Sequence, residues 1–76
     1  MKTVREMMRE YREAHGMTQR FVERRIGANL GRISALETGV VRLTADEFLD
    51  ICVRGFGISP QIFFAEQFPE KGNNVG

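Results

Sequence analysis

The 76-residue chain predicts an all-α domain built from five short helices. Three observations support this prediction. Apolar residues recur at helical spacing in several separate stretches. Residues that cap helices stand directly before these stretches, and glycines follow some of them. The connections are short, as in a compact helical domain. The predicted helices are 3–15, 18–26, 29–38, 44–55 and 59–66.

The first stretch, 3–15, has a strong amphipathic pattern. Its apolar residues fall on one helical face and are Val4, Met7, Met8 and Tyr11. Thr3 and Glu6 have the spacing of a capping box, which predicts where the helix begins. His15 lies at the predicted end, and we interpret it as a capping residue rather than a catalytic one. This helix is expected to serve as scaffold.

Two helices then follow in close succession. Thr18 is the predicted cap of the second helix, and Val22 and Ile26 supply its buried face. Gly27 breaks this pattern, and Asn29 is the predicted cap of the third helix. The apolar seam of the third helix is Ile33 and Leu36, and its terminating glycine is Gly39. Two capped helices joined by a short turn match the helix-turn-helix motif.

Two residues of the second helix do not fit a simple amphipathic pattern. Phe21 lies beside the apolar face, where it can widen the core or contact a partner. Glu23 lies close to the buried side of the helix. It needs a basic neighbour or access to solvent, because burying an unpaired carboxylate is costly.

The stretch 44–55 predicts the fourth helix and 59–66 the fifth. Thr44 and Glu47 again have capping-box spacing. Cys52 lies on the apolar face of the fourth helix, where we interpret it as a buried residue rather than a reactive thiol. Ser59 followed by Pro60 is a favoured start for the fifth helix.

The C-terminal part of the chain is rich in large apolar residues, namely Ile62, Phe63, Phe64 and Phe68. They exceed what one face of a short helix needs, so some should pack on the first and fourth helices. The remainder should form an exposed patch, which we predict to be a homodimer interface, with core packing as the alternative. The domain is expected to span 1–68, and the polar, glycine-rich segment 69–76 to be a flexible tail.

Several classes of site and function are excluded. A single cysteine leaves no internal disulfide, and no CxxC or histidine pair supports a metal site. No catalytic triad, carboxylate pair or phosphate loop is present, so we expect no enzyme activity and no cofactor. No apolar run reaches the roughly 18 residues of a transmembrane helix, and the charged N-terminus does not resemble a signal peptide. We expect a cytoplasmic protein with no membrane partner and no small-molecule ligand.

Charge is distributed unevenly along the chain. The net charge is only +1, but residues 1–42 carry nine Lys or Arg against five Asp or Glu. Residues 43–76 carry two against five. This asymmetry is compatible with a surface that faces a polyanion, and equally with ordinary solvated helix faces.

The segment HGMTQRFVERRIGANLGRISALETG, residues 15–39, resembles the helix-turn-helix of the Cro/CI, or XRE, family of repressors. LTADEFLDI and GISPQIFF resemble that family's fourth and fifth helices, so the resemblance covers 4–66. It implies a lambda-repressor-like five-helix domain in a transcriptional regulator that binds double-stranded DNA as a homodimer on a palindromic operator. Restriction–modification controller proteins and short phage or mobile-element repressors are most similar in design, which implies a prokaryotic or phage-encoded protein.

The resemblance also implies roles for individual residues. Phosphates would be contacted by Gln19, Arg20 and Arg42. Arg12 and Glu37 would form an internal ion pair between the first and third helices. The recognition helix would present five residues to the major groove, namely Asn29, Leu30, Gly31, Arg32 and Ala35.

The recognition helix departs from the family pattern at Leu30, Gly31 and Ala35. These side chains cannot make bidentate hydrogen bonds; they can touch a thymine methyl or allow close approach. Arg32 is the strongest candidate to contact a guanine or a phosphate. Specificity is therefore expected to depend on DNA shape and half-site spacing. The alternative is a protein-interaction module that keeps the fold and has weak or no DNA binding.

Overall fold

A computed structural model of the chain describes residues 2–64, and all regular structure within them is helical. The elements are α1 (Val4–Ala14), α2 (Gln19–Ile26), α3 (Arg32–Thr38), α4 (Ala45–Asp50), the π-helix η1 (Ile51–Phe56) and the 3-10 turn η2 (Pro60–Phe63). The all-α class is therefore confirmed.

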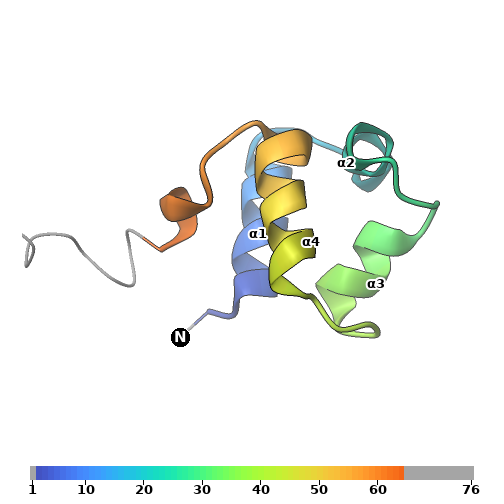
Figure 1. Ribbon diagram of the computed structural model, residues 1–76, viewed down its shortest axis with the longest axis horizontal. Coiled ribbons are helices and arrows are strands. Elements are labelled where there is room, and N and C mark those ends of the chain that lie inside the picture. The colour runs from blue at the N-terminus through green and yellow to red at the C-terminus, as the bar shows by residue number, and fades with distance from the viewer. Residues whose placement is uncertain (1, 65–76) are drawn as a thin grey trace, which may run out of the picture.

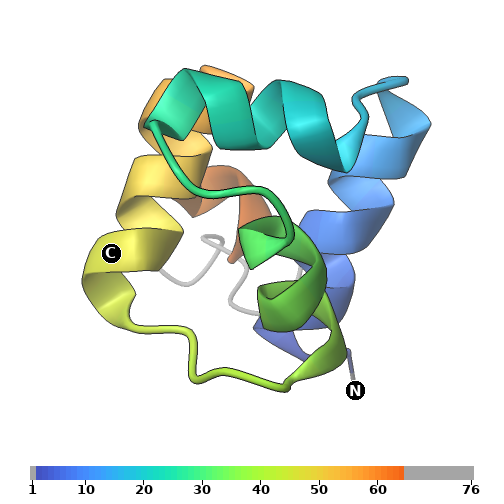
Figure 2. The same ribbon diagram turned by 90° about the vertical axis from the view of Figure 1, so that its right-hand side faces the viewer.

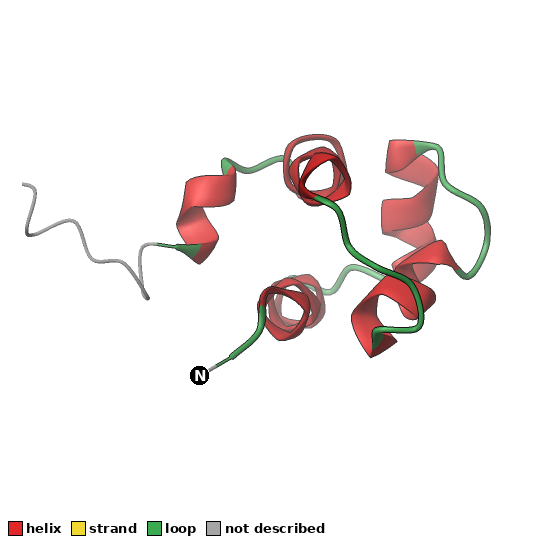
Figure 3. Ribbon diagram, turned by 60° about the horizontal axis from the view of Figure 1, so that its bottom comes forward, coloured by secondary structure: helices red, strands yellow, loops and turns green. Residues whose placement is uncertain are grey.

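The helices surround one small core. α1 and the continuous helix formed by α4 and η1 stand side by side, and both are seen end-on in Figure 3. α2 crosses above them and α3 lies in front, between the two (Figure 2). η2 lies on the opposite side of this pair from α2 and α3 (Figure 1). The arrangement leaves α2, α3 and the turn between them together at one end of the molecule.

Three of the helices differ from the sequence-based prediction in extent or in type. The third helix begins at Arg32 rather than at residue 29. Gly31 adopts a left-handed conformation with φ of 92°, so the residues before Arg32 cannot continue the helix. The predicted fourth helix changes from α to π geometry at Ile51. The fifth is a single 3-10 turn that ends at Phe63. Its predicted continuation to residue 66, the tail 69–76 and Phe68 lie outside the described residues.

The two predicted capping boxes are not equivalent. In α1 both bonds are present, since the Glu6 amide donates to the Thr3 hydroxyl and the Thr3 amide donates to the Glu6 carboxylate. In α4 the Glu47 amide donates to the Thr44 hydroxyl at 3.1 Å. Within residues 2–64 the reciprocal bond is missing, because the Glu47 carboxylate is turned toward α3. The capping-box spacing of Thr44 and Glu47 therefore gives a hydroxyl cap but not a complete capping box.

The core is formed by side chains from every element, including Met8, Val22, Leu36 and Ile51. Phe63 is 6% exposed and belongs to this core, with its ring 5.7 Å from that of Tyr11. The expectation that Phe63 lies on an exposed patch is therefore wrong, because its ring packs in the core of its own chain.

η1 packs directly on α2 at Gly55. A Cβ atom at this position would lie 3.0 Å from Cγ1 of Val22, which is closer than side chains normally approach. Because Gly55 has no side chain, the backbone of the α4–η1 helix packs directly on Val22 of α2. This contact orients the first half of the helix-turn-helix. None of the helices in the described part is long and apolar enough to cross a membrane.

Cys52 provides a test of this core. The thiol is fully buried, and burial raises its pKa from 9.0 to about 11 because the thiolate would lose its hydration. We expect the folded protein at pH 8 to react slowly with a thiol reagent such as DTNB, and urea-unfolded protein to react rapidly. Rapid labelling of the folded chain would contradict the packing around η1.

The same pKa shift predicts a pH dependence of stability. An acid whose folded pKa is raised stays protonated in the folded state while the unfolded state ionises, so stability falls as pH rises from 9.0 toward about 11. Urea unfolding measured across this range should show a steeper alkaline loss for the wild-type chain than for Cys52→Ala.

Candidate nucleic-acid interface

α2 and α3 form a two-helix unit joined by the turn 27–31. Thr18 caps α2, since its hydroxyl accepts a hydrogen bond from the Phe21 amide at 3.0 Å. Gly27 ends α2 in the left-handed conformation, which turns the chain sharply toward α3. Gly39 ends α3 in the same way. The local sequence therefore builds two short helices whose ends are set by caps and glycines.

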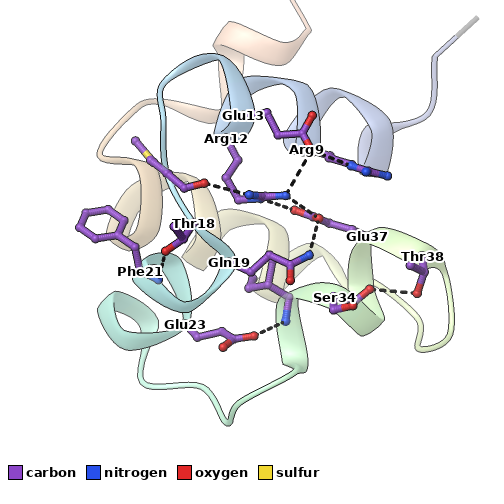
Figure 4. A network of polar contacts seen from close by, with 12 residues as sticks. Arg9, Arg12, Glu13, Thr18, Gln19, Phe21, Glu23, Ser34, Glu37 and Thr38 are labelled. Carbon is purple, nitrogen blue, oxygen red and sulfur yellow. Dashed lines mark hydrogen bonds and ion pairs between the residues drawn. The ribbon is translucent and has the colours of Figure 1, made fainter.

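A buried carboxylate joins this unit to the rest of the domain. The side chain of Glu37, on α3, is 3% exposed. It accepts hydrogen bonds from Nε of Arg12 at 2.7 Å and from Nη2 of Arg12 at 3.0 Å (Figure 4). Arg12 also donates through Nη1 to the Met17 carbonyl at 2.8 Å. The pair implied by the family resemblance is thus a two-bond contact between α1 and α3 that also holds the α1–α2 connection.

Gln19 takes part in the same cluster. Its Nε2 donates to Oε1 of Glu37 at 3.0 Å, so the start of α2 is tied to α3 (Figure 4). A primary amide carries two N–H groups, and one of them is used here. The residue expected to contact phosphate therefore has a structural bond within the protein as well.

A second buried carboxylate, that of Glu23 on α2, holds the other end of α3. The residue is 1% exposed, and its Oε2 accepts from the Gly31 and Ile33 amides, each at 3.0 Å. Its Oε1 lies 3.4 Å from Nη1 of Arg20. Glu23 therefore satisfies amides at the start of α3 that a capping side chain would normally satisfy.

This geometry corrects the predicted cap of the third helix. Asn29 does not cap α3 with its side chain; its backbone carbonyl accepts from the Arg32 amide at 3.1 Å. The cap is supplied from α2 by Glu23 because Gly31, the residue before the helix, has no side chain to offer. The signal was present in the sequence, where an acid close to the buried side of α2 required a partner.

The five residues predicted for recognition do not share one helix. Asn29, Leu30 and Gly31 lie in the exposed turn before α3, and Leu30 is 78% exposed. Ala35 lies on α3 and is partly buried. The most prominent side chain of the turn is thus apolar.

Arg32, the first residue of α3, points toward α4. Its Nε donates to Oε2 of Glu47 at 2.9 Å, and Nη2 donates to the same oxygen. Both side chains remain partly exposed. Arg32, which was predicted to contact a guanine or a phosphate, is therefore already paired with Glu47. The sequence had indicated only a helix-capping role for Glu47.

Three further arginines near this unit differ in how available they are to an anion. Arg42, in the linker between α3 and α4, is exposed and makes no hydrogen bond or ion pair within the described part of the chain. Arg20 is partly exposed beside Glu23. Arg25, on α2, donates through Nε to the carbonyls of Arg54 and Gly55, so it fastens α2 to η1. Arg42 and Arg20 are thus better placed than Arg25 to meet an anion.

Residues 2–64 contain no group of three or more His, Cys, Asp or Glu side chains arranged to hold a metal ion. A family model described as helix-turn-helix matches residues 8–63 of the chain. No curated protein matches the chain, and no solved structure does so either. The matched span begins within α1 and ends with η2, so it contains the α2–α3 unit and both buried carboxylates.

Glu23 provides a direct test of how α3 is held. Replacing it with alanine leaves the Gly31 and Ile33 amides without their acceptor, and we expect a loss of about 2–3 kcal/mol in the free energy of unfolding. Urea denaturation followed by circular dichroism measures this change. Glu10→Ala is the matched control, since it removes an exposed acid that pairs with exposed Lys2. Equal stabilities of the two variants would contradict the proposed cap.

Proposed function

The chain belongs to the Cro/CI-type helix-turn-helix family of DNA-binding proteins, and we propose that it is a transcriptional regulator that binds a palindromic operator as a homodimer. The observation that carries the proposal is the α2–α3 unit itself. Glu23 and Glu37 hold α3 near its two ends, while the turn before it stays exposed. Such an arrangement suits a helix that must enter the major groove without deforming.

Phosphate contacts in this proposal come from three side chains. Arg42 is exposed and unpaired in the described residues, and Arg20 extends from the first turn of α2. Gln19 can offer its second amide N–H while the first stays bonded to Glu37. These contacts would supply most of the affinity, and because they displace counterions they make it strongly dependent on salt.

Direct reading of bases would be limited. Leu30 can touch a thymine methyl, and Gly31 and Ala35 permit close approach without donating hydrogen bonds. Asn29 adds one amide side chain in the same exposed turn. We therefore propose that sequence preference comes mainly from DNA shape and from the spacing of two half-sites. A two-fold dimer would place its recognition helices about 34 Å apart.

The dimer interface in this proposal uses Ile62 and not Phe63 from the predicted apolar patch. Ile62 is 48% exposed, whereas Phe64 is partly buried and packs against the core. Ile62 lies beside a hollow lined by Met7, Tyr11 and Phe63, so a partner side chain could enter next to it. We propose this surface, formed by α1 and η2, as the contact between two copies.

A protein-interaction module is the second candidate function. It is favoured by the exposure of Leu30 and by that of Val40, which is 77% exposed in the linker after α3. Both apolar side chains flank α3, where a DNA-binding surface is usually polar. A complex with a protein partner that survives high salt, together with no DNA binding at low salt, would support this function instead.

DNA binding can be tested by fluorescence anisotropy with a labelled duplex of operator length at several salt concentrations. We expect binding at low salt, and we expect Arg42→Ala to weaken it and to reduce the slope of log K against log salt by about 0.9. Arg54→Ala is the control, because Arg54 is exposed on η1, at the far end of the α4–η1 helix from Arg42.

Two outcomes of this experiment are decisive. Absence of wild-type binding at low salt would reject the DNA-binding function. An equal loss in both variants would show that the effect is one of overall charge rather than of a contact at Arg42.

The oligomeric state can be measured by sedimentation velocity. We expect the wild-type chain to form dimers and Ile62→Lys to shift it toward monomers, because a buried lysine at the interface would lack a partner. Leu49→Lys is the matched control, since Leu49 is 46% exposed on α4. Dissociation by the Leu49 variant alone would place the interface on α4 and contradict the proposed one.

A further inference from the structure

The Glu47 carboxylate has two possible hydrogen-bond donors, the Arg32 guanidinium and the Thr44 amide, and it accepts only from Arg32. It occupies the same position relative to Thr44 as Glu6 does relative to Thr3, and both helices begin with the same hydroxyl cap. The two caps match closely, since each hydroxyl accepts from the corresponding glutamate amide at 3.1 Å. Glu6 therefore shows how a glutamate at this position behaves when no arginine binds its carboxylate.

The two carboxylates differ in where they point. Glu6 accepts from the Thr3 amide at 2.9 Å and completes its capping box. Glu47 accepts instead from Arg32 of α3, through Nε at 2.9 Å and through Nη2. As a result the Thr44 amide has no acceptor within residues 2–64. The difference is explained by Arg32, which brings a guanidinium to α4, whereas Glu6 forms no ion pair in the described part of the chain.

We propose that Glu47 is an exchangeable partner of Arg32 that tunes the DNA affinity of the chain. In the free protein Glu47 holds Arg32. When DNA binds, the Arg32 guanidinium leaves Glu47 and donates hydrogen bonds to a phosphate or a base. The Glu47 carboxylate then rotates, accepts from the Thr44 amide and completes the capping box of α4. This inference rests on the proposed DNA-binding function, but the exchange itself can be tested without DNA.

The exchange leaves neither charged group without a partner. Arg32 trades a carboxylate for a phosphate or a guanine edge, and the guanidinium can bind each of these through two N–H groups. Glu47 trades the guanidinium for an amide at the positive end of α4. Because the pair is partly exposed, solvent screens it and little opposes its opening. The other acid close by, Asp50, is bonded to Arg54 at 3.0 Å and not to Arg32.

The consequence for binding is a reduced contribution from Arg32. In the free chain its charge is offset by Glu47, and this ion pair must open before the DNA can bind the guanidinium. A glutamine at position 47 removes that charge while keeping the side chain able to cap α4. Glu47 is therefore a positioning residue that acts through Arg32.

The DNA-free test is amide hydrogen exchange at Thr44, measured by NMR on labelled protein. We expect the Thr44 amide to exchange rapidly in the wild-type chain and about fivefold more slowly in Arg32→Gln, where the freed carboxylate turns back to it. The Thr3 amide, already bonded to Glu6, is the internal control and should not change. An unchanged Thr44 amide in the variant would overturn the exchange, whether or not the protein binds DNA.

The DNA test compares Glu47→Gln with Glu6→Gln, its matched control in the other capping box. We expect Glu47→Gln to bind a duplex about fivefold more tightly than wild type at low salt, because the pair is removed. The slope of log K against log salt should steepen by up to about 0.9, because Glu47 no longer offsets the charge that Arg32 presents to the DNA. Glu6→Gln should match wild type in both. The double variant Arg32→Gln/Glu47→Gln should show no gain over Arg32→Gln.

Each outcome bears on a different claim. Weaker binding by Glu47→Gln, or a gain that persists without Arg32, would overturn the tuning role, since the effect would not pass through the ion pair. A wild-type chain that does not bind DNA would reject the proposed function and with it the tuning role. A Thr44 amide protected in Arg32→Gln would in that case still support exchange between the two partners.

Discussion

The Glu37 carboxylate is the interaction on which the rest of the structure depends. It lies on α3 and accepts two hydrogen bonds from Arg12 of α1 and one from Gln19 at the start of α2. Arg12 in turn holds the Met17 carbonyl of the α1–α2 connection. A buried charge is tolerated only when its hydrogen-bonding capacity is used, and here two bonds come from α1 and one from the start of α2. The orientation of the helix-turn-helix is thus set by one satisfied ionic cluster.

Glu23 complements this cluster at the other end of α3. α3 has seven residues, too few to be stable in isolation, and it carries no side-chain cap of its own. Glu23 supplies the acceptor from α2, so the two helices of the motif form a unit through a carboxylate as well as through apolar packing. The turn between them can then remain exposed, with Leu30 projecting from it, without loosening the helix that follows.

Much of the positive charge in the N-terminal half serves the fold. Arg12 is buried with Glu37, Arg25 holds carbonyls of the α4–η1 helix, and Arg32 pairs with Glu47. The excess of basic residues in 1–42 therefore overstates the charge that can meet a polyanion. A surface with an apolar turn and several paired arginines agrees with our proposal of a regulator of modest affinity that gains specificity from dimerisation, and with the proposed tuning of that affinity by the Arg32–Glu47 pair.

The sequence by itself determined the helical class, the caps at Thr3 and Thr18, and the glycines that end α2 and α3, because these depend on residues close together in the chain. The family pattern also pointed to the contact between Arg12 and Glu37. Only the tertiary structure decided the start of α3, the burial of Phe63 and the partner of Arg32. At α3 and at Arg32 a group from another helix competes with the local preference: Glu23 replaces Asn29 as the cap, and Glu47 leaves its capping box for a guanidinium. Phe63 is buried because the fold places it against Tyr11 of α1. Such choices depend on which groups the fold brings within hydrogen-bonding distance, and spacing along the chain does not contain that information.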